Sequence, residues 1–369
     1  MITEGKTDIT CREARYNPAN VSALDDFFAR LITEKKIQAA GYLLARGNGI
    51  FAHKFMGGLR FDKPDRPFLP GSLRKIASIT KVFTALAVMR LAEEGLLSLE
   101  EPAADFIPEF DTPLHRGITV WHLLTHSAGL KADPGYFLEP YPLWADMKGL
   151  DDLIRFAVEG PLQSRPGETW SYSSLGFVLL SVIIARASGV PYTGYVEREI
   201  LKPSRMNDTH FRVPEDKVDR VCFTLAYELR EFEKMQSGKT FFLGGSGLTS
   251  TPYDLFRLGR LLLQKGTLDG VRVLGRKTIE ALVRDQFNPA TTAYCWGMHL
   301  KPMEYGAGVS ISLGGILSRF VYNHEGYGRC TFFADPEEDF TAVFFVPTAT
   351  HWLPEIIENP RYIIWSGLE

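Results

Sequence analysis

Apolar residues recur at helical spacing in some stretches of the chain and alternate with polar residues or form short runs in others. Apolar side chains three and four residues apart predict an amphipathic helix, whereas alternation or a short β-branched run predicts a strand. The first pattern predicts helices at 21–37, 78–94, 118–126, 175–188 and 252–265. The second predicts strands at 41–46, 50–55, 309–316, 319–323, 329–334 and 341–346. The tail after His351 is expected to be a helix that packs on the sheet and is interrupted by Pro360.

The order of these elements predicts the architecture. Strands lie at both ends of the chain and helices fill its middle, so the two termini should build one antiparallel sheet that a mainly helical insertion interrupts. The sequence therefore predicts an α+β fold in a single domain of residues 1–369. Its α/β part would come from 1–65 and 290–369, and its mainly helical part from 66–289. A cleft is expected where the two parts meet.

Composition and charge exclude some classes of function. The chain has 369 residues and a formal net charge of -3, and no basic block predicts nucleic-acid binding. The longest apolar run, 177–185, is too short to span a bilayer and ends at Arg186. No signal-peptide pattern is visible after Met1, and the four cysteines are scattered, so we expect a cytoplasmic protein with reduced core thiols.

Ser78 and Lys81 are the first candidates for chemistry. They stand three residues apart at the start of a predicted helix, so their side chains share one face of that helix. A serine at a helix N-terminus also has free backbone N–H groups beside it. A nucleophile, an amine that can take its proton and amide donors for an oxyanion would then lie close together.

Two simpler interpretations compete with this one. Ser-x-x-Lys is a short pattern, so Ser78 could be an ordinary N-cap serine and Lys81 a solvated surface lysine. The pattern also occurs at Ser72 and Lys75, although that copy follows a Pro-Gly pair in a turn-like stretch ahead of the helix. Further motifs along the chain favour Ser78.

Three more stretches stand out, and together with Ser78-x-x-Lys81 they resemble one family. They are 119–130, which ends in Thr-His-Ser-Ala-Gly-Leu, 166–174, which ends in Ser-Tyr-Ser-Ser, and 322–328, which contains His-Glu-Gly. In this order, over roughly residues 20–350, they resemble the serine β-lactamase and penicillin-binding-protein superfamily. The resemblance is to the branch that includes class C β-lactamases, DD-peptidases, D-aminopeptidases and family VIII esterases, and it implies a β-lactamase/transpeptidase-like fold.

The resemblance implies a role for each matching residue. Ser78 would be the acylated nucleophile, and Lys81 the amine that relays its proton. Tyr172 would pass the proton between Ser78 and the leaving group. The amide N–H groups of Ser78 and Tyr327 would form the oxyanion hole.

The substrate-binding residues that the resemblance implies are Ser174, His324 and Gly326, of which Gly326 lets the strand backbone approach the substrate. Ser174 replaces the usual asparagine of Tyr-x-Asn and offers less hydrogen bonding to an amide carbonyl. His324 stands where other members have the lysine of Lys-Thr-Gly, and with a pKa of about 6.5 it would attract a carboxylate less at pH 7. We therefore expect esters to be cleaved better than β-lactams, and β-lactam turnover to improve as the pH falls toward the His324 pKa.

Other patterns are set aside. His122 and His126 have the i, i+4 spacing of a zinc-binding helix, but Leu123 stands where the metalloprotease motif needs glutamate. The glycine-rich stretch 244–247 is not a phosphate loop, because no Gly-Lys-Ser/Thr follows it; the family has a similar turn beside its cleft. Gly-x-Ser-x-Gly is absent, which argues against an α/β-hydrolase. We expect neither a metal nor a cofactor.

The sequence thus predicts a serine hydrolase that acts through an acyl-enzyme on a small-molecule ester, amide or peptide and is weak on β-lactams. Two rivals stay open. One is a catalytically silent member that uses the cleft for binding, with Tyr172 a core tyrosine and His324 a strand histidine without a role in chemistry. The other is an acyltransferase that uses the same serine. The sequence predicts neither the natural substrate nor the oligomeric state.

Overall fold

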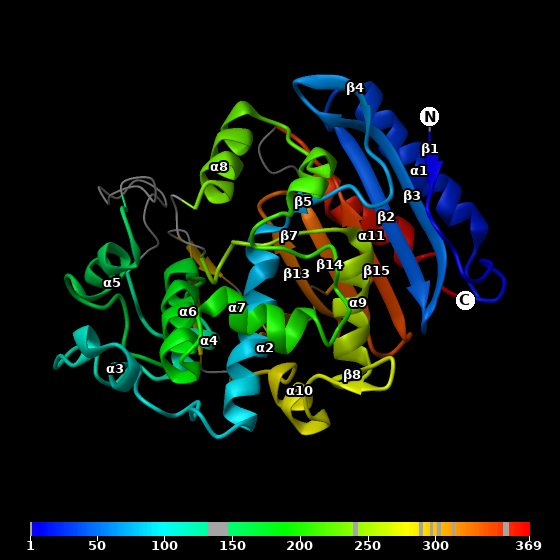
Figure 1. Cartoon of the computed structure of the whole chain (residues 1–369). Coiled ribbons are helices and arrows are strands. Elements are labelled where there is room, and N and C mark those ends of the chain that lie inside the picture. Colours follow the sequence, from blue (N-terminus) through cyan, green and yellow to red (C-terminus); the bar gives the residue numbers. More distant parts are fainter. Residues whose placement is uncertain are drawn as a thin grey trace.

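The centre of the structure is an antiparallel sheet built from both ends of the chain (Figure 1). The computed structural model describes residues 2–131, 147–238, 243–287, 291–295, 298–300, 304–311, 314–349 and 354–369. The eight strands of the sheet are β1 (Ile2–Glu4), β2 (Ala39–Arg46), β3 (Gly49–Arg60), β4 (Lys63–Pro67), β12 (Ser310–Ile311), β13 (Tyr322–Gly326), β14 (Cys330–Asp335) and β15 (Phe340–Phe345). Their order is β1-β3-β2-β15-β14-β13-β12, with β4 paired to β3. The two ends of the sequence meet where β2 pairs with β15, so the predicted sheet is confirmed.

Different helices cover the two faces of the sheet, because successive side chains of a strand point to opposite faces. Tyr42 and Leu44 of β2 belong to the core shared with α1 (Pro18–Thr33) and α11 (Glu358–Trp365). Leu43 and Ala45 point to the other face, where α9 (Pro252–Leu263) lies across β2, β14 and β15. Both faces are buried, so the central strands contain short apolar runs rather than a strict alternation.

The middle of the chain is mainly helical. Its other helices are α2 (Thr80–Glu93), α3 (Ala103–Phe106), α4 (Val120–Leu124), α5 (Leu150–Val158), α6 (Ser174–Ser188), α7 (Tyr192–Val196), α8 (Ala226–Gln236) and α10 (Arg276–Leu282). α6 lies against α2, α3, α4, α5 and α7. Residues 175–184 of α6 are all buried, which explains why its sequence is apolar on every side.

One continuous apolar core joins the sheet to the helices. It contains Leu43 and Val343 of the sheet, Leu86 of α2 and Phe177 of α6. Elements that share a core are expected to fold as a unit. We therefore propose that residues 1–369 form a single domain, as the sequence suggests.

Short strands connect loops of the helical part. They are β5 (Arg74–Lys75) with β7 (Thr249–Ser250), β6 (Thr169–Trp170) with β10 (Thr292–Cys295) and β11 (Met298–Leu300), and β8 (Thr267–Leu268) with β9 (Val271–Arg272). Strands of two residues have no periodic pattern, so the sequence does not predict them. Of the strand predicted at 309–316, the described residues contain β12, and Gly314 and Gly315 have positive φ angles; residues 312–313 lie outside the described part.

Two predicted helices differ from the structure. The helix predicted at 118–126 is the shorter α4, and His126 beyond it has a left-handed backbone with a φ of 57°. The predicted interruption of the last helix at Pro360 is wrong. Pro360 lies in the first turn of α11, where a helix does not need the backbone N–H that proline lacks.

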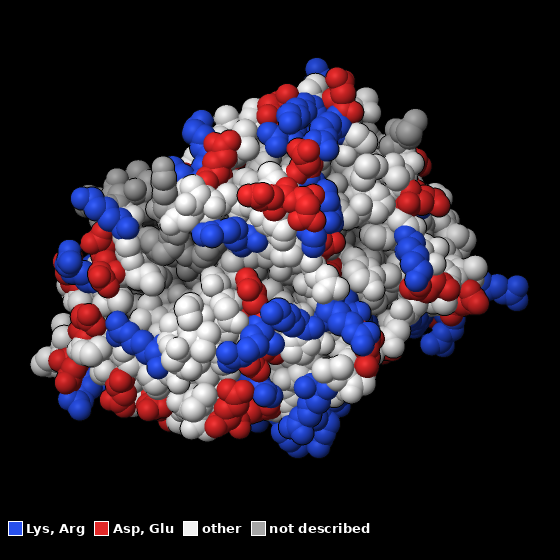
Figure 2. All heavy atoms as spheres, in the orientation of Figure 1, with Lys and Arg blue, Asp and Glu red and all other residues white. Residues whose placement is uncertain are grey.

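Acidic and basic side chains are interspersed over the face of the molecule seen in Figure 2, in keeping with the small net charge. Within the described residues, no single helix is long and apolar enough to cross a bilayer. α6 and the segment Tyr192–Leu201 reach the length and apolar composition of a span only when they are taken together, and they are bent by 78° relative to each other.

Candidate active site

Ser78 lies in a 3₁₀ turn, Ala77–Ile79, that leads directly into α2. Ala77 has a φ of 45°, a left-handed conformation that costs a residue with a side chain roughly 1–2 kcal/mol. Ala77 and Ile79 are buried, whereas Ser78 is partly exposed. Strained backbone of this kind is concentrated at functional sites, and here it immediately precedes the predicted nucleophile.

Lys81 is fully buried in the first turn of α2. Its Nζ lies 3.2 Å from Ser78 Oγ, 3.2 Å from Ser174 Oγ and 3.0 Å from the carbonyl oxygen of Gly245, so three acceptors match the three N–H groups of an ammonium. Nζ also lies 4.7 Å from the centroid of the Tyr172 ring. The alternative of a solvated surface lysine is therefore wrong.

Ser72, the competing serine, has a local contact of its own. It is buried, and its Oγ accepts a hydrogen bond of 2.9 Å from the backbone N–H of Leu69, which closes the turn ahead of β5. Arg74, two residues later, is buried and makes a bidentate ion pair with Glu228. These contacts explain Ser72 as a turn residue.

The loop between β6 and α6 brings Tyr172 and Ser174 to Lys81. Ser173 is the N-cap of α6, because its Oγ accepts a hydrogen bond from the backbone N–H of Gly176. Ser174 is the first residue of the helix, and its Oγ accepts from Lys81. Two serines in sequence thus have different tasks: the first fixes the start of α6 and the second faces the lysine.

His126 supports this loop. Its Nδ1 accepts a hydrogen bond of 3.0 Å from the backbone N–H of Ser173, so Nε2 carries the proton and donates to the hydroxyl of Tyr305 at 3.1 Å. The imidazole lies 4.6 Å from the Tyr172 ring, centroid to centroid. Burial, with the charge of Lys81 adding to it, holds the pKa of His126 well below its usual value. His126 is therefore a neutral residue that holds the loop containing Tyr172 and Ser174.

The sequence analysis gives this histidine no role beyond the zinc pair that it sets aside, although it lies in one of the stretches that resemble the family. The structure uses both histidines for other contacts, because Nδ1 of His122 accepts from the backbone N–H of Thr119 at the start of α4. The one sequence signal for His126 is its place in the stretch 119–130 that resembles the family. Its helical spacing from His122 is typical of a zinc-binding helix instead.

His324 is buried on β13, and its ring centroid lies 6.4 Å from that of Tyr172. Its Nδ1–H donates to the carbonyl oxygen of Glu325 at 2.8 Å, which leaves a lone pair on Nε2. Burial, and then the charge of Lys81, lower the pKa of His324 to about 3. The expected gain of charge near pH 6.5 is therefore wrong: burial beside a lysine keeps this histidine neutral.

Gly326 and Gly328 bring the end of β13 against the turn that carries Ser78. A Cβ at position 326 would lie 2.0 Å from the carbonyl oxygen of Ile76, and one at position 328 would lie 2.5 Å from that of Lys75. Only glycine permits this approach. The segments that contain the amides of Ser78 and Tyr327 are thereby side by side, and the side chain of Tyr327 is exposed.

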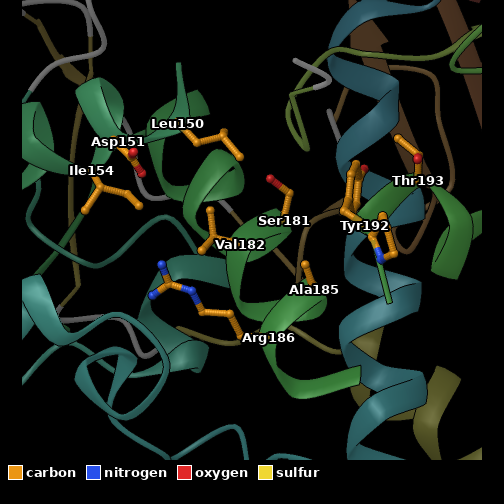
Figure 3. Close-up of a pocket in the computed structure, with 10 residues that line it drawn as sticks. Leu150, Asp151, Ile154, Ser181, Val182, Ala185, Arg186, Tyr192 and Thr193 are labelled. Carbon is orange, nitrogen blue, oxygen red and sulfur yellow. The ribbon is translucent and has the colours of Figure 1, made fainter. Parts of the chain in front are cut away.

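The structure thus places Ser78, Tyr172 and Ser174 around the amino group of Lys81, and His324 beside Tyr172. The sequence missed His126, and it missed the carbonyl of Gly245 as a ligand of that ammonium. A pocket of about 390 Å³ lies elsewhere, between α5, α6 and α7, and none of its lining residues is a predicted site residue (Figure 3).

Comparison with known proteins places this site in a family. The model of the Beta-lactamase family matches residues 24–362, and the chain belongs to this family. Penicillin-binding protein 4* of Bacillus subtilis (strain 168) is 30% identical over 238 residues, which cover 60% of this chain and 51% of that protein. Esterase EstB of Burkholderia gladioli is 32% identical over 204 residues, which cover 51% of this chain and 50% of the esterase.

A solved structure shows the same fold. The penicillin-binding protein homologue from Caulobacter crescentus aligns with a TM-score of 0.75 and 21% identity over 98% of this chain and 99% of that one. The chain spans about half the length of the curated relatives named above. The protein therefore has the β-lactamase/transpeptidase-like fold.

Proposed function

We propose that the protein is a serine hydrolase that cleaves esters through an acyl-enzyme on Ser78, with amides or peptides as slower substrates and β-lactams as poor ones. The observation that carries the proposal is the fully buried Nζ of Lys81, 3.2 Å from Ser78 Oγ. A buried amine within hydrogen-bond distance of a partly exposed serine is the arrangement that activates a hydroxyl nucleophile.

The proposed reaction starts from the uncharged amine form of Lys81. Ser78 Oγ attacks the ester carbonyl while its proton passes to Lys81 Nζ. The oxyanion forms opposite the amides of Ser78 and Tyr327. Collapse breaks the bond to the alcohol, which takes the proton back by way of Tyr172. Water then attacks the acyl-enzyme, with the same groups as base and acid, and releases the carboxylic acid and free Ser78.

The preference for esters rests on His324 and Ser174. His324 is neutral and presents a lone pair, so it cannot attract the carboxylate of a β-lactam or of a peptide C-terminus as a lysine would. Ser174 Oγ already accepts a hydrogen bond from Lys81, and the serine side chain is shorter than that of the asparagine that it replaces. An ester needs only the nucleophile and the oxyanion donors, which neither change affects.

A fluorophosphonate probe tests the proposal together with a panel of short-chain aryl esters, D-amino acid amides and a chromogenic cephalosporin. Wild type should be labelled at Ser78 and should cleave the esters fastest. Ser78→Ala should lose labelling and turnover, whereas Ser72→Ala, the matched control, should keep both. If the wild type is neither labelled nor active, the result would favour the silent binding member. If the enzyme forms more acyl-transfer product than hydrolysis product when an alcohol is added, the result would favour an acyltransferase.

A further inference from the structure

The segment Gly244–Gly245 lies against the proposed catalytic lysine, with no room for a side chain at 244 and a tight fit for one at 245. A Cβ at position 244 would lie 2.3 Å from the carbonyl oxygen of Phe177, and one at position 245 would lie 3.4 Å from Lys81 Nζ. The backbone carbonyls are therefore what this segment offers its neighbours. The carbonyl of Gly245 accepts from Lys81 Nζ at 3.0 Å.

Thr84, one turn after Lys81 on α2, holds the adjacent carbonyl. Its Oγ1 donates to the carbonyl oxygen of Gly244 at 2.6 Å and lies 2.7 Å from the hydroxyl of Tyr192. A threonine has a single hydroxyl proton, and a carbonyl can only accept. The Gly244 carbonyl oxygen at 2.6 Å is nearer to Thr84 Oγ1 than the Thr80 carbonyl oxygen at 3.2 Å, so Gly244 receives the proton. Tyr192 must therefore be the donor to Thr84, which gives the order Tyr192 to Thr84 to Gly244.

Tyr192 begins α7 and is buried, and its ring lies between the pocket of Figure 3 and the side of α2. Burial raises the pKa of its phenol, so the hydroxyl stays protonated and remains a donor. A line of hydrogen bonds therefore leads from α7 through α2 to the peptide that contacts the catalytic amine.

We propose that Thr84 and Tyr192 are positioning residues: they fix the Gly244–Gly245 backbone so that the Gly245 carbonyl holds Lys81 Nζ within reach of Ser78. This inference rests on the proposed function and adds residues to its mechanism. A lysine side chain has several rotatable bonds, so its direction depends on its acceptors. Displacement of one acceptor by about 1 Å would misplace the amine, and errors of that size cost up to about 100-fold in rate.

Thr84→Val, Thr84→Ser and Tyr192→Phe test the inference, with Tyr195→Phe as the matched control. Tyr195 is on the same helix, and its hydroxyl donates to Glu94 rather than to the site. The measurements are kcat and KM for aryl-ester hydrolysis, the rate of labelling by the fluorophosphonate, and the melting temperature. A role limited to stability would change the melting temperature but not the properties of the folded enzyme.

Thr84→Val should lower kcat and the labelling rate by about tenfold or more at unchanged KM, and Tyr192→Phe should lower both by less. Thr84→Ser keeps the hydroxyl and should restore kcat to near the wild-type value, as should the control Tyr195→Phe. If Thr84→Val does not fold, Tyr192→Phe decides. It removes only the hydrogen bond between Tyr192 and Thr84 and keeps the one between Thr84 and Gly244, so it disturbs the buried site less.

The inference is overturned if Tyr192→Phe and Thr84→Val keep the wild-type kcat, or if Tyr195→Phe loses as much as they do. In both cases wild type is active, so the proposed function stands and only the positioning role fails. A wild type that is neither labelled nor active overturns the proposed function, and the positioning role with it.

Discussion

Lys81 is the residue at which chemistry and stability conflict most clearly. Burial of an ammonium is costly unless every N–H finds an acceptor, and Lys81 meets that condition with two hydroxyls and a carbonyl. An apolar residue there would avoid the cost altogether. A buried cation beside a serine is therefore a sign of function, more specific than the Ser-x-x-Lys spacing that first pointed to it.

Lys81→Ala and Tyr172→Phe should each lower kcat by roughly 10²- to 10⁴-fold, because both groups serve the same proton transfers. Their effects should not add, so the double variant should be about as slow as the slower single variant. Steady-state kinetics on an aryl ester, with the melting temperature as a check on folding, measure this. Full activity in Tyr172→Phe would remove the tyrosine from the mechanism.

The structure changes the role expected for His324: the residue is a neutral hydrogen-bond acceptor, whereas the sequence suggested a weak cation. Because burial lowers the pKa of His324 to about 3, its charge does not change near neutral pH. The ratio of kcat/KM for an aryl ester to that for a cephalosporin should therefore stay constant from about pH 5.5 to 8. A ratio that falls steadily as the pH is lowered through about 6.5 would show that His324 gains a proton in the free enzyme.

At the scale of elements, the site depends on the contact between the end of β13 and the turn before α2. The resemblance points to Gly326, but the sequence does not explain why a glycine is needed there. In the structure, a Cβ at position 326 would lie 2.0 Å from the carbonyl oxygen of Ile76. That contact joins residues about 250 positions apart in the chain, so no local pattern predicts it.

Gly326→Ala should therefore separate the Ser78 turn from β13 and lower kcat by about 100-fold, with a lower melting temperature. Gly117→Ala is the matched control, because Gly117 is exposed and nothing lies within 4 Å of the Cβ that it would add. It should keep wild-type activity. Equal kinetics for the two variants would mean that the close approach of β13 has no role in catalysis.

For the whole molecule, the sequence predicts β2, β3, β14 and β15 of the sheet well because these strands are long enough to show a pattern and are separated by clear turn residues. It does not predict β1 or β4. It also predicts that strands at the two ends of the chain share that sheet, from their order alone. It cannot predict the two-residue strands, or the conformation of Ala77 and His126, because long-range packing determines these. The same holds for the hydrogen bonds of Thr84 and Tyr192, which join elements about 100 residues apart.

The histidines that this packing buries determine how the stability of the molecule responds to pH. His53, His115, His126 and His324 are buried, and burial lowers the pKa of each, to about 4 for His53 and about 3 for His324. In the unfolded chain each would take up a proton near pH 6.5. Below that pH only the unfolded state binds these protons, so the contribution of each histidine to stability is complete above about 6.5 and is lost as the pH falls toward its folded pKa.

Asp254 acts in the opposite direction. Burial raises its pKa to about 6, so the folded protein takes up this proton first, and stability increases as the pH falls from about 6 toward the ordinary aspartate pKa of 3.8. One carboxylate offsets only part of the effect of four histidines. We therefore expect the free energy of unfolding to be lower at pH 5.5 than at about pH 7.5, by about 1.4 kcal/mol for each fully neutral histidine.

Denaturant unfolding at these two pH values measures the difference. His53→Leu should reduce it by about the contribution of one histidine, about 1.4 kcal/mol, because His53 is buried on β3 away from the site residues. His299→Leu replaces an exposed histidine and should leave the difference as in wild type. Equal stability of the wild type at both pH values would show that the buried histidines acquire protons in the folded state. The neutral imidazoles assigned to His126 and His324 would then be wrong as well.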